Sequence, residues 1–426
     1  YLIANDFSCY VILDNCPPDV HRRLQKQVSS NQAKLSLLTI EYDISDDRPE
    51  ETEVIHIEPS SEQTVSKLIQ KRFLSLGRVN ADKVAEFSGG NARVAIALAS
   101  RVDSDETLAS FTDEELFQRL FNQRKGSTES LLESAEVLSL VYSFNVSTQE
   151  FNNELDVLSK IGGLERNKLN RNHAELLRRQ LSQQRGNWRA VLPHALANRL
   201  ARRALQNIDP DQINAELFKS DNLRLFKSCA HRLGYLHDFE PARLLAYTWM
   251  KIGGPFHNIA MCDDELLKAL SHVAPVFPDI VLTAIENASE TEGFCSRNNQ
   301  NFSVFVRLLR KIAYDDQYFD RAAEIILRFS ETEKPGENNN SIASQLSSLF
   351  SLYLSGTKAT PTRRLSFVKR MLDSGDVRKL ELVQDILRSA FETSHWSSYG
   401  DFDFGARSRG FGWEPVTSKE KSDWYV

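Results

Sequence analysis

Two side chains near the start of the chain could handle a metal-bound phosphate. Asp14 ends the apolar run 9–14, and Thr39 lies near the end of a second apolar run, 34–41. A carboxylate at the carboxyl end of a buried strand can hold a hard cation such as Mg²⁺, and a neighbouring hydroxyl can face the same phosphate. Many ordinary strands also end in Asp, so the pattern is equally typical of a plain parallel sheet.

A glycine-rich turn could contact the same phosphate. Gly90 and Asn91 belong to the run 88–93, Ser-Gly-Gly-Asn-Ala-Arg, which opens a short apolar helix predicted over 92–99. Glycine lets a backbone approach a ligand closely, and Arg93 in the first helical turn could reach a phosphate with its planar guanidinium. Gly-Gly-Asn is also typical of a simple helix cap.

A histidine in the helix-rich region 103–207 is a further candidate. The helices expected there are 113–122, 127–142, 148–161, 173–184 and 193–206. The polar turn 184–187, followed by the apolar run 188–192, predicts a β-wing before the last helix. His194 opens that helix after Pro193, and a histidine at this position can simply cap the helix or face solvent.

The elements that position these residues change along the chain. Apolar runs at 9–14, 34–41 and 54–57 have short crossovers between them, which predicts the edge of a parallel α/β sheet. Pro59 closes the third run, and helical spacing starts at residue 60.

Residues 208–392 read as helical throughout and repeat weakly. Similar segments begin at Phe239, Phe277 and Phe319. A period near ~40 residues is typical of HEAT- or TPR-like arrays, although an irregular helical array fits nearly as well. The glycine- and aromatic-rich tail, 393–426, is expected to cap the last helices, with a disordered end or a ligand-reading surface as alternatives.

The order of these features resembles the back half of a STAND-type P-loop NTPase, a relative of the AAA+, NACHT and NB-ARC proteins. The resemblance places Asp14 at the family's Walker B aspartate, which binds Mg²⁺, and Thr39 near its sensor-1 position. Pro59 belongs to the segment that leads into the family's helical lid. About residues 5–207 take part in the resemblance.

The resemblance also assigns nucleotide contacts further along the chain. Gly90, Asn91 and Arg93 are similar to the lid motif, and His194 stands where the family places a histidine that contacts the β-phosphate of ADP. The implied ligands are ATP or ADP with Mg²⁺.

Two departures from the family pattern bear on activity. No G-x-x-x-x-G-K-[ST] loop occurs, which truncation upstream of Tyr1 would explain. Asn15 follows Asp14 where hydrolytic relatives often carry an acid, and an amide cannot usefully accept a proton. We therefore expect any ATP hydrolysis by the complete protein to be slow, as in a switch.

The predicted fold is mainly α, with a partial α/β NTPase core, a helical lid, a winged helix and a TPR- or HEAT-like array. The expected domains are 1–59 (core), 60–102 (lid), 103–207 (winged helix), 208–392 (helical-repeat sensor) and 393–426 (tail). The resemblance implies a switch, closest to bacterial antiphage proteins. A protein ligand on the repeats, such as a phage protein, would promote ADP/ATP exchange and self-association.

Composition excludes several other classes. The chain has 426 residues, 26% of them charged, and a net charge of −6, which fits neither a disordered acidic chain nor a globally basic nucleic-acid binder. It has no apolar run of about 18 residues, so no membrane span is expected. Its 5 cysteines form no CxxC pair, which favours reduced thiols and a cytoplasmic location.

Basic residues are concentrated between Lys160 and Arg203. Such a stripe on a winged helix could bind DNA phosphates, so a transcription regulator with the repeats binding an inducer is the alternative function. The arginines could instead pair with acids of neighbouring domains or meet the nucleotide. A plain helical scaffold with an inert α/β remnant is a third possibility.

Overall fold

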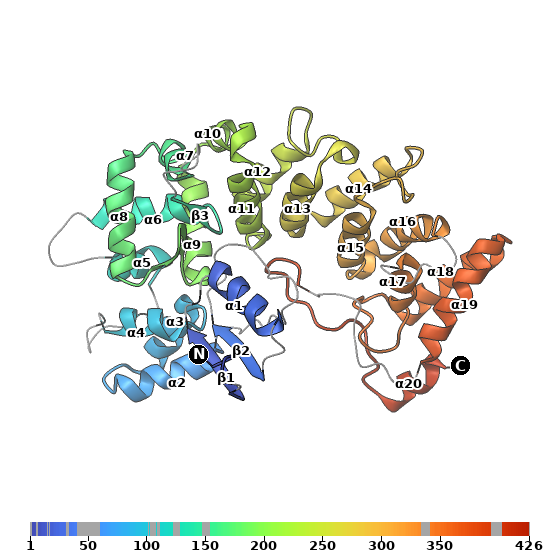
Figure 1. Cartoon of the computed structure of the whole chain (residues 1–426), viewed down its shortest axis with the longest axis horizontal. Coiled ribbons are helices and arrows are strands. Elements are labelled where there is room, and N and C mark those ends of the chain that lie inside the picture. Colours follow the sequence, from blue (N-terminus) through green and yellow to red (C-terminus); the bar gives the residue numbers. More distant parts are fainter. Residues whose placement is uncertain are drawn as a thin grey trace. The chain divides into compact units, whose positions relative to one another are not determined.

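The computed structural model divides the chain after Arg232 into two compact units, each of which is mainly helical (Figure 1). The prediction of a mainly α protein is therefore confirmed. The residues that the structure describes are 2–5, 7–14, 16, 18–30, 34–40, 60–100, 102, 108, 111–121, 128–146, 154–333, 341–392 and 403–425.

The first unit begins with a small parallel sheet. Strands β1 (Cys9–Asp14) and β2 (Leu35–Ile40) pair in register along their whole length, and α1 (Pro18–Ser30) connects them. Both strands confirm the sequence prediction. The third predicted strand, 54–57, and Pro59 lie outside the described residues, as does Asn15.

Three short helices follow the sheet: α2 (Glu62–Arg72), α3 (Arg78–Ser88) and α4 (Ala92–Ala99). The bounds of α4 are those that the apolar run predicts. The three helices pack on one another through aliphatic side chains that are at most 1% exposed, among them Val65, Ile69, Val84 and Leu98. Burial of such side chains provides most of the stability of helices this short.

The rest of the first unit combines helices with a three-stranded antiparallel sheet of order β3-β5-β4. Its elements are α5 (Asp113–Phe121), α6 (Thr128–Ser139), β3 (Phe144–Asn145), α7 (Glu154–Ile161), α8 (Arg166–Arg178), β4 (Ser182–Arg185), β5 (Trp188–Val191), α9 (His194–Asn207) and α10 (Pro210–Leu217). Gly186, with φ 55°, turns the hairpin between β4 and β5. A hairpin is thus present at the position where the sequence predicts one.

One helix prediction in this region is wrong. The expected helix 173–184 is replaced by α8, which ends at Arg178, and by β4. Gln180 takes a left-handed φ of 60°, which a continuing helix cannot accommodate. The strand pairing from Ser182 onward then satisfies backbone groups that the helix would otherwise have paired.

Helix α11 (Leu223–Gly234) crosses the division, and the second unit continues as successive helices. These are α12 (Glu240–Met250), α13 (Asp264–Val273), α14 (Pro278–Ser289), α15 (Phe302–Ile312), α16 (Phe319–Glu331), α17 (Ile342–Ser348), α18 (Pro361–Asp373) and α19 (Val377–Phe391). Phe239, Phe277 and Phe319 stand at the starts of α12, α14 and α16, so the three repeated segments occupy equivalent positions. Contacts join α13 to α15, α14 to α16 and α15 to α17.

The described part of the tail, residues 403–425, lies against these helices and ends in α20 (Ser418–Trp424). Trp424 donates its indole N–H to the carbonyl of Ala390 at 2.8 Å, and its ring stacks on Trp413 with centroids 5.8 Å apart. The predicted capping role is confirmed for this part of the tail. None of the described helices combines the length and the apolarity that crossing a membrane requires.

Candidate functional site

The turn between α3 and α4 is built by two glycines in left-handed conformations. Gly89 has φ 58° and Gly90 has φ 76°. Their backbone N–H groups donate to the carbonyls of Glu86 at 3.0 Å and Ala85 at 3.3 Å, which is a glycine cap of α3. These N–H groups are therefore engaged within the turn.

Asn91 caps the next helix. Its side-chain Oδ1 accepts hydrogen bonds from the backbone N–H groups of Arg93 and Val94, both at 3.1 Å. The cap interpretation of Gly-Gly-Asn is thus confirmed. The Arg93 guanidinium, by contrast, is exposed and has no hydrogen-bond or ion-pair partner among the described residues, so it is available to an external ligand.

The same turn touches the start of α9. A Cβ added to Gly89 would lie only 2.2 Å from the Cβ of Ala195, so glycine is required for the two segments to approach this closely. Arg199 on the same helix donates to the carbonyl of Glu86 at 3.4 Å. His194, the first residue of α9, therefore lies next in sequence to a residue in contact with the glycine turn.

Aromatic and charged contacts hold this joint together. The Arg199 guanidinium lies 5.4 Å from the ring centroid of Phe87 and pairs with Asp113 at 2.5 Å. Phe87 also packs edge-on against Phe117, with ring centroids 5.2 Å apart. Both rings are almost fully buried, so α3, α5 and α9 form one packed assembly.

His194 is one ring of a three-ring stack. Its imidazole stacks on Tyr142 with centroids 4.2 Å apart, and His231 stacks on the same tyrosine at 3.9 Å. Beneath them, the buried Arg232 donates to the side chain of Asn198 at 2.5 Å. Sequence reasoning did not single out Tyr142 or His231, since no local pattern links the α6–β3 connection, α9 and α11.

Asp14 and Thr39 lie at one edge of the parallel sheet. Asp14 pairs with Ile40, and Leu13 pairs with Thr39, so both residues stand at the carboxyl ends of their strands, as predicted. The Thr39 hydroxyl lies 3.0 Å from Nδ1 of His21. The side chain of Asp14 is outside the described part of the structure, and the meeting of this edge with the glycine turn stays a prediction.

Two buried ionisable groups of the first unit are His173, on α8, and Glu136, on α6. His173 is 3% exposed, its Nε2 is 3.1 Å from the Ser182 hydroxyl, and burial lowers its pKa from 6.5 to about 4. Burial raises the pKa of Glu136 to about 7, although Arg203 donates to it at 2.7 Å. Neither group is open to a ligand, so we assign both to the packing of this region.

Most arginines of the basic stripe are paired within the first unit. Ion pairs join Arg166 to Asp156, Arg178 and Arg179 to Glu175, Arg199 to Asp113, and Arg203 to Glu136. Lys168 and Arg171, on α8, are exposed and form no such pair with the described residues. These pairs all lie within residues 103–207, so the partners of these arginines are acids of the same predicted domain rather than of neighbouring domains.

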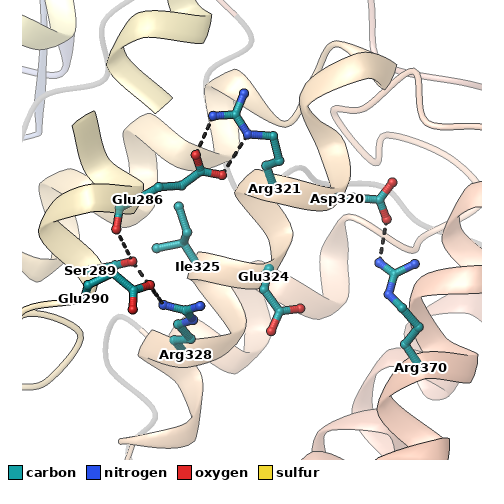
Figure 2. A pocket seen from close by; sticks show the side chains of 9 residues that line it. All are labelled: Glu286, Ser289, Glu290, Asp320, Arg321, Glu324, Ile325, Arg328 and Arg370. Atoms are coloured by element: carbon teal, nitrogen blue, oxygen red, sulfur yellow. Dashed lines mark hydrogen bonds and ion pairs between the residues drawn. The ribbon is translucent and has the colours of Figure 1, made fainter. Parts of the chain in front are cut away.

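A groove of about 360 Å³ in the second unit is lined by α14, α16 and α18 (Figure 2). Its arginines are largely neutralised by pairs that join alternate helices, α14 with α16 and α16 with α18: Arg321 with Glu286, Arg328 with Glu290, and Arg370 with Asp320. We interpret these ion pairs as contacts that link the helices. Because they are partly exposed to solvent, each pair contributes little to stability.

Neither a metal-binding cluster nor a match to known proteins identifies a function for the described residues. No group of three or more His, Cys, Asp or Glu side chains among the described residues is arranged to hold a metal ion. No protein-family model, curated protein or solved structure matches the chain.

Proposed function

We propose that this chain is part of a STAND-type nucleotide switch, in which the glycine turn 88–91 and His194 belong to one nucleotide pocket. The close approach of Gly89 to Ala195 carries the proposal, because it joins two motifs that lie about a hundred residues apart in the sequence. A resemblance made only of unrelated local patterns would give no reason for these two segments to meet.

The order of the elements supports the same assignment. A winged helix runs helix, strand, helix, helix and then a hairpin, and α6, β3, α7, α8, β4 and β5 follow that order. The sheet order β3-β5-β4, with the first strand beside the last, also agrees with it. The stacked helices from α11 to α19 would then form the repeat array that acts as the sensor.

In the proposed pocket, side chains rather than the backbone of the glycine turn would bind the diphosphate. The N–H groups of Gly89 and Gly90 are engaged in the helix cap, and Asn91 caps α4. The exposed guanidinium of Arg93 and the imidazole of His194 have the chemistry to bind phosphate. Asp14 would hold Mg²⁺, which would supply charge neutralisation at the phosphates.

A switch of this kind requires a ligand that distinguishes two states. The closed state would keep ADP between the lid and His194. A protein ligand on the repeat array must bind the open state more tightly, or it would not change the balance between the states. Exchange for ATP and self-association in the cytoplasm would follow from opening, and the resemblance suggests antiphage defence as the setting.

The test is nucleotide binding by the protein made from the complete open reading frame that encodes this chain. We expect ADP to bind, and Arg93→Ala and His194→Gln each to weaken ADP binding by about tenfold or more, since each removes one phosphate contact. Arg72→Ala is the matched control, because Arg72 is another exposed arginine of the three short helices.

Two outcomes would contradict the proposal. One is the absence of ADP binding by the complete protein at millimolar ADP, which would leave a helical scaffold as the better interpretation. The other is equal affinity of the Arg93, His194 and Arg72 variants. Steady-state ATP turnover is expected below about 1 s⁻¹, and faster turnover would contradict a slow switch.

DNA binding is the second candidate, and it rests on one observation. Lys168 and Arg171 project from the exposed side of α8, the helix that would follow the turn of a winged helix. If DNA binds there, Lys168→Ala combined with Arg171→Ala should abolish a salt-dependent increase in the anisotropy of a labelled duplex. Unchanged duplex binding by the double variant would exclude α8 as the contact.

A further inference from the structure

Residues 403–413 of the tail, here named the strap, run along one edge of the second unit. The strap contacts the last residue of α11 and one residue in each of the connections that follow α13, α15 and α17. These residues are Gly234, Pro275, Tyr314 and Thr357, and each accepts one hydrogen bond from the strap. The donors, in the same order, are the Ala406 N–H (3.4 Å), the Arg407 Nε (2.6 Å), the Gly410 N–H (2.9 Å, to the Tyr314 hydroxyl) and the Trp413 N–H (2.6 Å); the other three acceptors are backbone carbonyls. We name this row of turns the turn edge.

The spacing of the turn edge follows the helical repeat. Its members lie about 40 residues apart, as in the repeated sequence segments. Each helix pair therefore contributes an equivalent turn, and the strap crosses four pairs in succession. A segment bound in this way is held mainly by backbone groups that the turns present.

One side chain of the strap is bound more specifically. Arg409 donates to the carbonyl of Lys311 at 2.5 Å and lies 3.4 Å from a carboxylate oxygen of Asp315. Its guanidinium also lies over two rings, 4.5 Å from the centroid of Tyr314 and 4.2 Å from that of Phe404. The side chain is only 4% exposed, so the end of α15 and the turn after it, together with Phe404 of the strap, enclose an arginine.

The remaining fit requires glycine at two points, Gly405 and Gly412, which have positive φ and leave no room for a side chain. A Cβ added to Gly405 would lie 2.2 Å from Gly234 O, and one added to Gly412 would lie 2.7 Å from the Ser355 hydroxyl. Between them, Ser408 is exposed while Arg407 and Arg409 on either side of it are more buried, which is the alternation of a short extended segment lying on a surface.

We propose that the turn edge is a binding site for an extended, arginine-bearing polypeptide, and that the strap occupies this site within the same chain. The carbonyl acceptors and the Asp315 pocket would recognise any segment that has arginine at the Arg409 position and small residues at the two close approaches. A partner with such a segment would compete with the strap. The inference uses only the second unit and stands independently of the nucleotide switch.

The test measures whether the strap and a free peptide compete. The probe is a fluorescein-labelled peptide with the sequence of residues 403–413, added to the full chain. Arg409→Glu places a carboxylate against Asp315 and should release the strap, whereas Ser408→Glu makes a charge substitution at the exposed neighbour. Since a tethered segment acts at an effective concentration in the millimolar range, we expect the Arg409→Glu chain to bind the peptide at least about tenfold more tightly than the Ser408→Glu chain.

A second peptide and a second measurement make the result decisive. The peptide with Arg409→Glu should bind neither chain. In the unmodified chain, millimolar wild-type peptide should speed amide exchange at Gly410 and Trp413 severalfold, because it displaces the strap. Equal peptide affinities of the two variant chains, equal binding of the two peptides, or unchanged amide exchange would each overturn the proposal.

Discussion

Lowering the pH from 7 to 5 is expected to reduce the free energy needed to separate α8 from the β4–β5 hairpin, because His173 takes up a proton when this region opens. Burial lowers the pKa of this imidazole from 6.5 to about 4. The unfolded chain therefore binds a proton between these pH values that the folded chain does not, and stability falls as the pH falls. From the two pKa values, the loss between pH 7 and pH 5 is about 2 kcal/mol.

The structure explains why His173 resists protonation. Its Nε2 lies 3.1 Å from the Ser182 hydroxyl, which itself donates to the carbonyl of Ala190 at 2.7 Å. Phe144 meets the ring edge-on at 5.4 Å, so no carboxylate compensates a positive charge in these contacts. Glu136 acts in the opposite direction, since burial raises its pKa to about 7 and acid stabilises the folded state.

The comparison that isolates His173 uses a variant that does not titrate. His173→Gln keeps a polar group near Ser182, and amide exchange of α8 and β4, corrected for intrinsic rates, gives the local opening free energy. Between pH 7 and pH 5 this free energy should fall by about 2 kcal/mol more in the wild-type chain than in the variant. His257→Gln, in the second unit, is the control. A difference below about 0.5 kcal/mol would refute the reasoning.

Three further expectations concern stability and reactivity. Gly89→Ala should lower the free energy of unfolding by about 1–3 kcal/mol more than Gly163→Ala in urea titrations, because both glycines have positive φ but only Gly89 would gain a clash. Equal losses would contradict the close packing. Arg364→Lys should cost about 1–3 kcal/mol in the same assay, since the buried guanidinium donates to three carbonyls and a hydroxyl that an ammonium cannot all reach. Burial raises the pKa of Cys229 to about 12, so iodoacetamide at pH 8 should modify this thiol only after the chain unfolds. Peptide mass mapping measures the modification, and rapid modification of the native chain would contradict the burial of Cys229.

Local patterns in the sequence determined most of the secondary structure. Apolar runs specified β1 and β2, and alternating small and apolar residues specified α4 with its bounds at Ala92 and Ala99. Gly186 marked the hairpin, because a tight turn there needs positive φ. The helix predicted over 173–184 failed because strand pairing in the tertiary structure outweighed a helical spacing of side chains.

Sequence patterns identified only part of the candidate site. Motif spacing singled out the glycine turn and His194, but neither period nor composition could place them side by side. Tyr142 and His231 carried no signal at all, since they reach the His194 stack from the α6–β3 connection and from α11. Asp14 was correctly placed at a strand end, which is a property of its neighbours in sequence.

Contacts between distant residues were decided by the tertiary structure alone. Gly89 meets Ala195, and Arg409 enters the pocket of Asp315, because helices packed at defined angles bring turns together. Hydrophobic periodicity specifies which face of a helix is buried, yet it does not specify the partner that covers it. For this chain, the sequence therefore set the elements and their caps, while long-range packing set which of the chemically capable side chains share a surface.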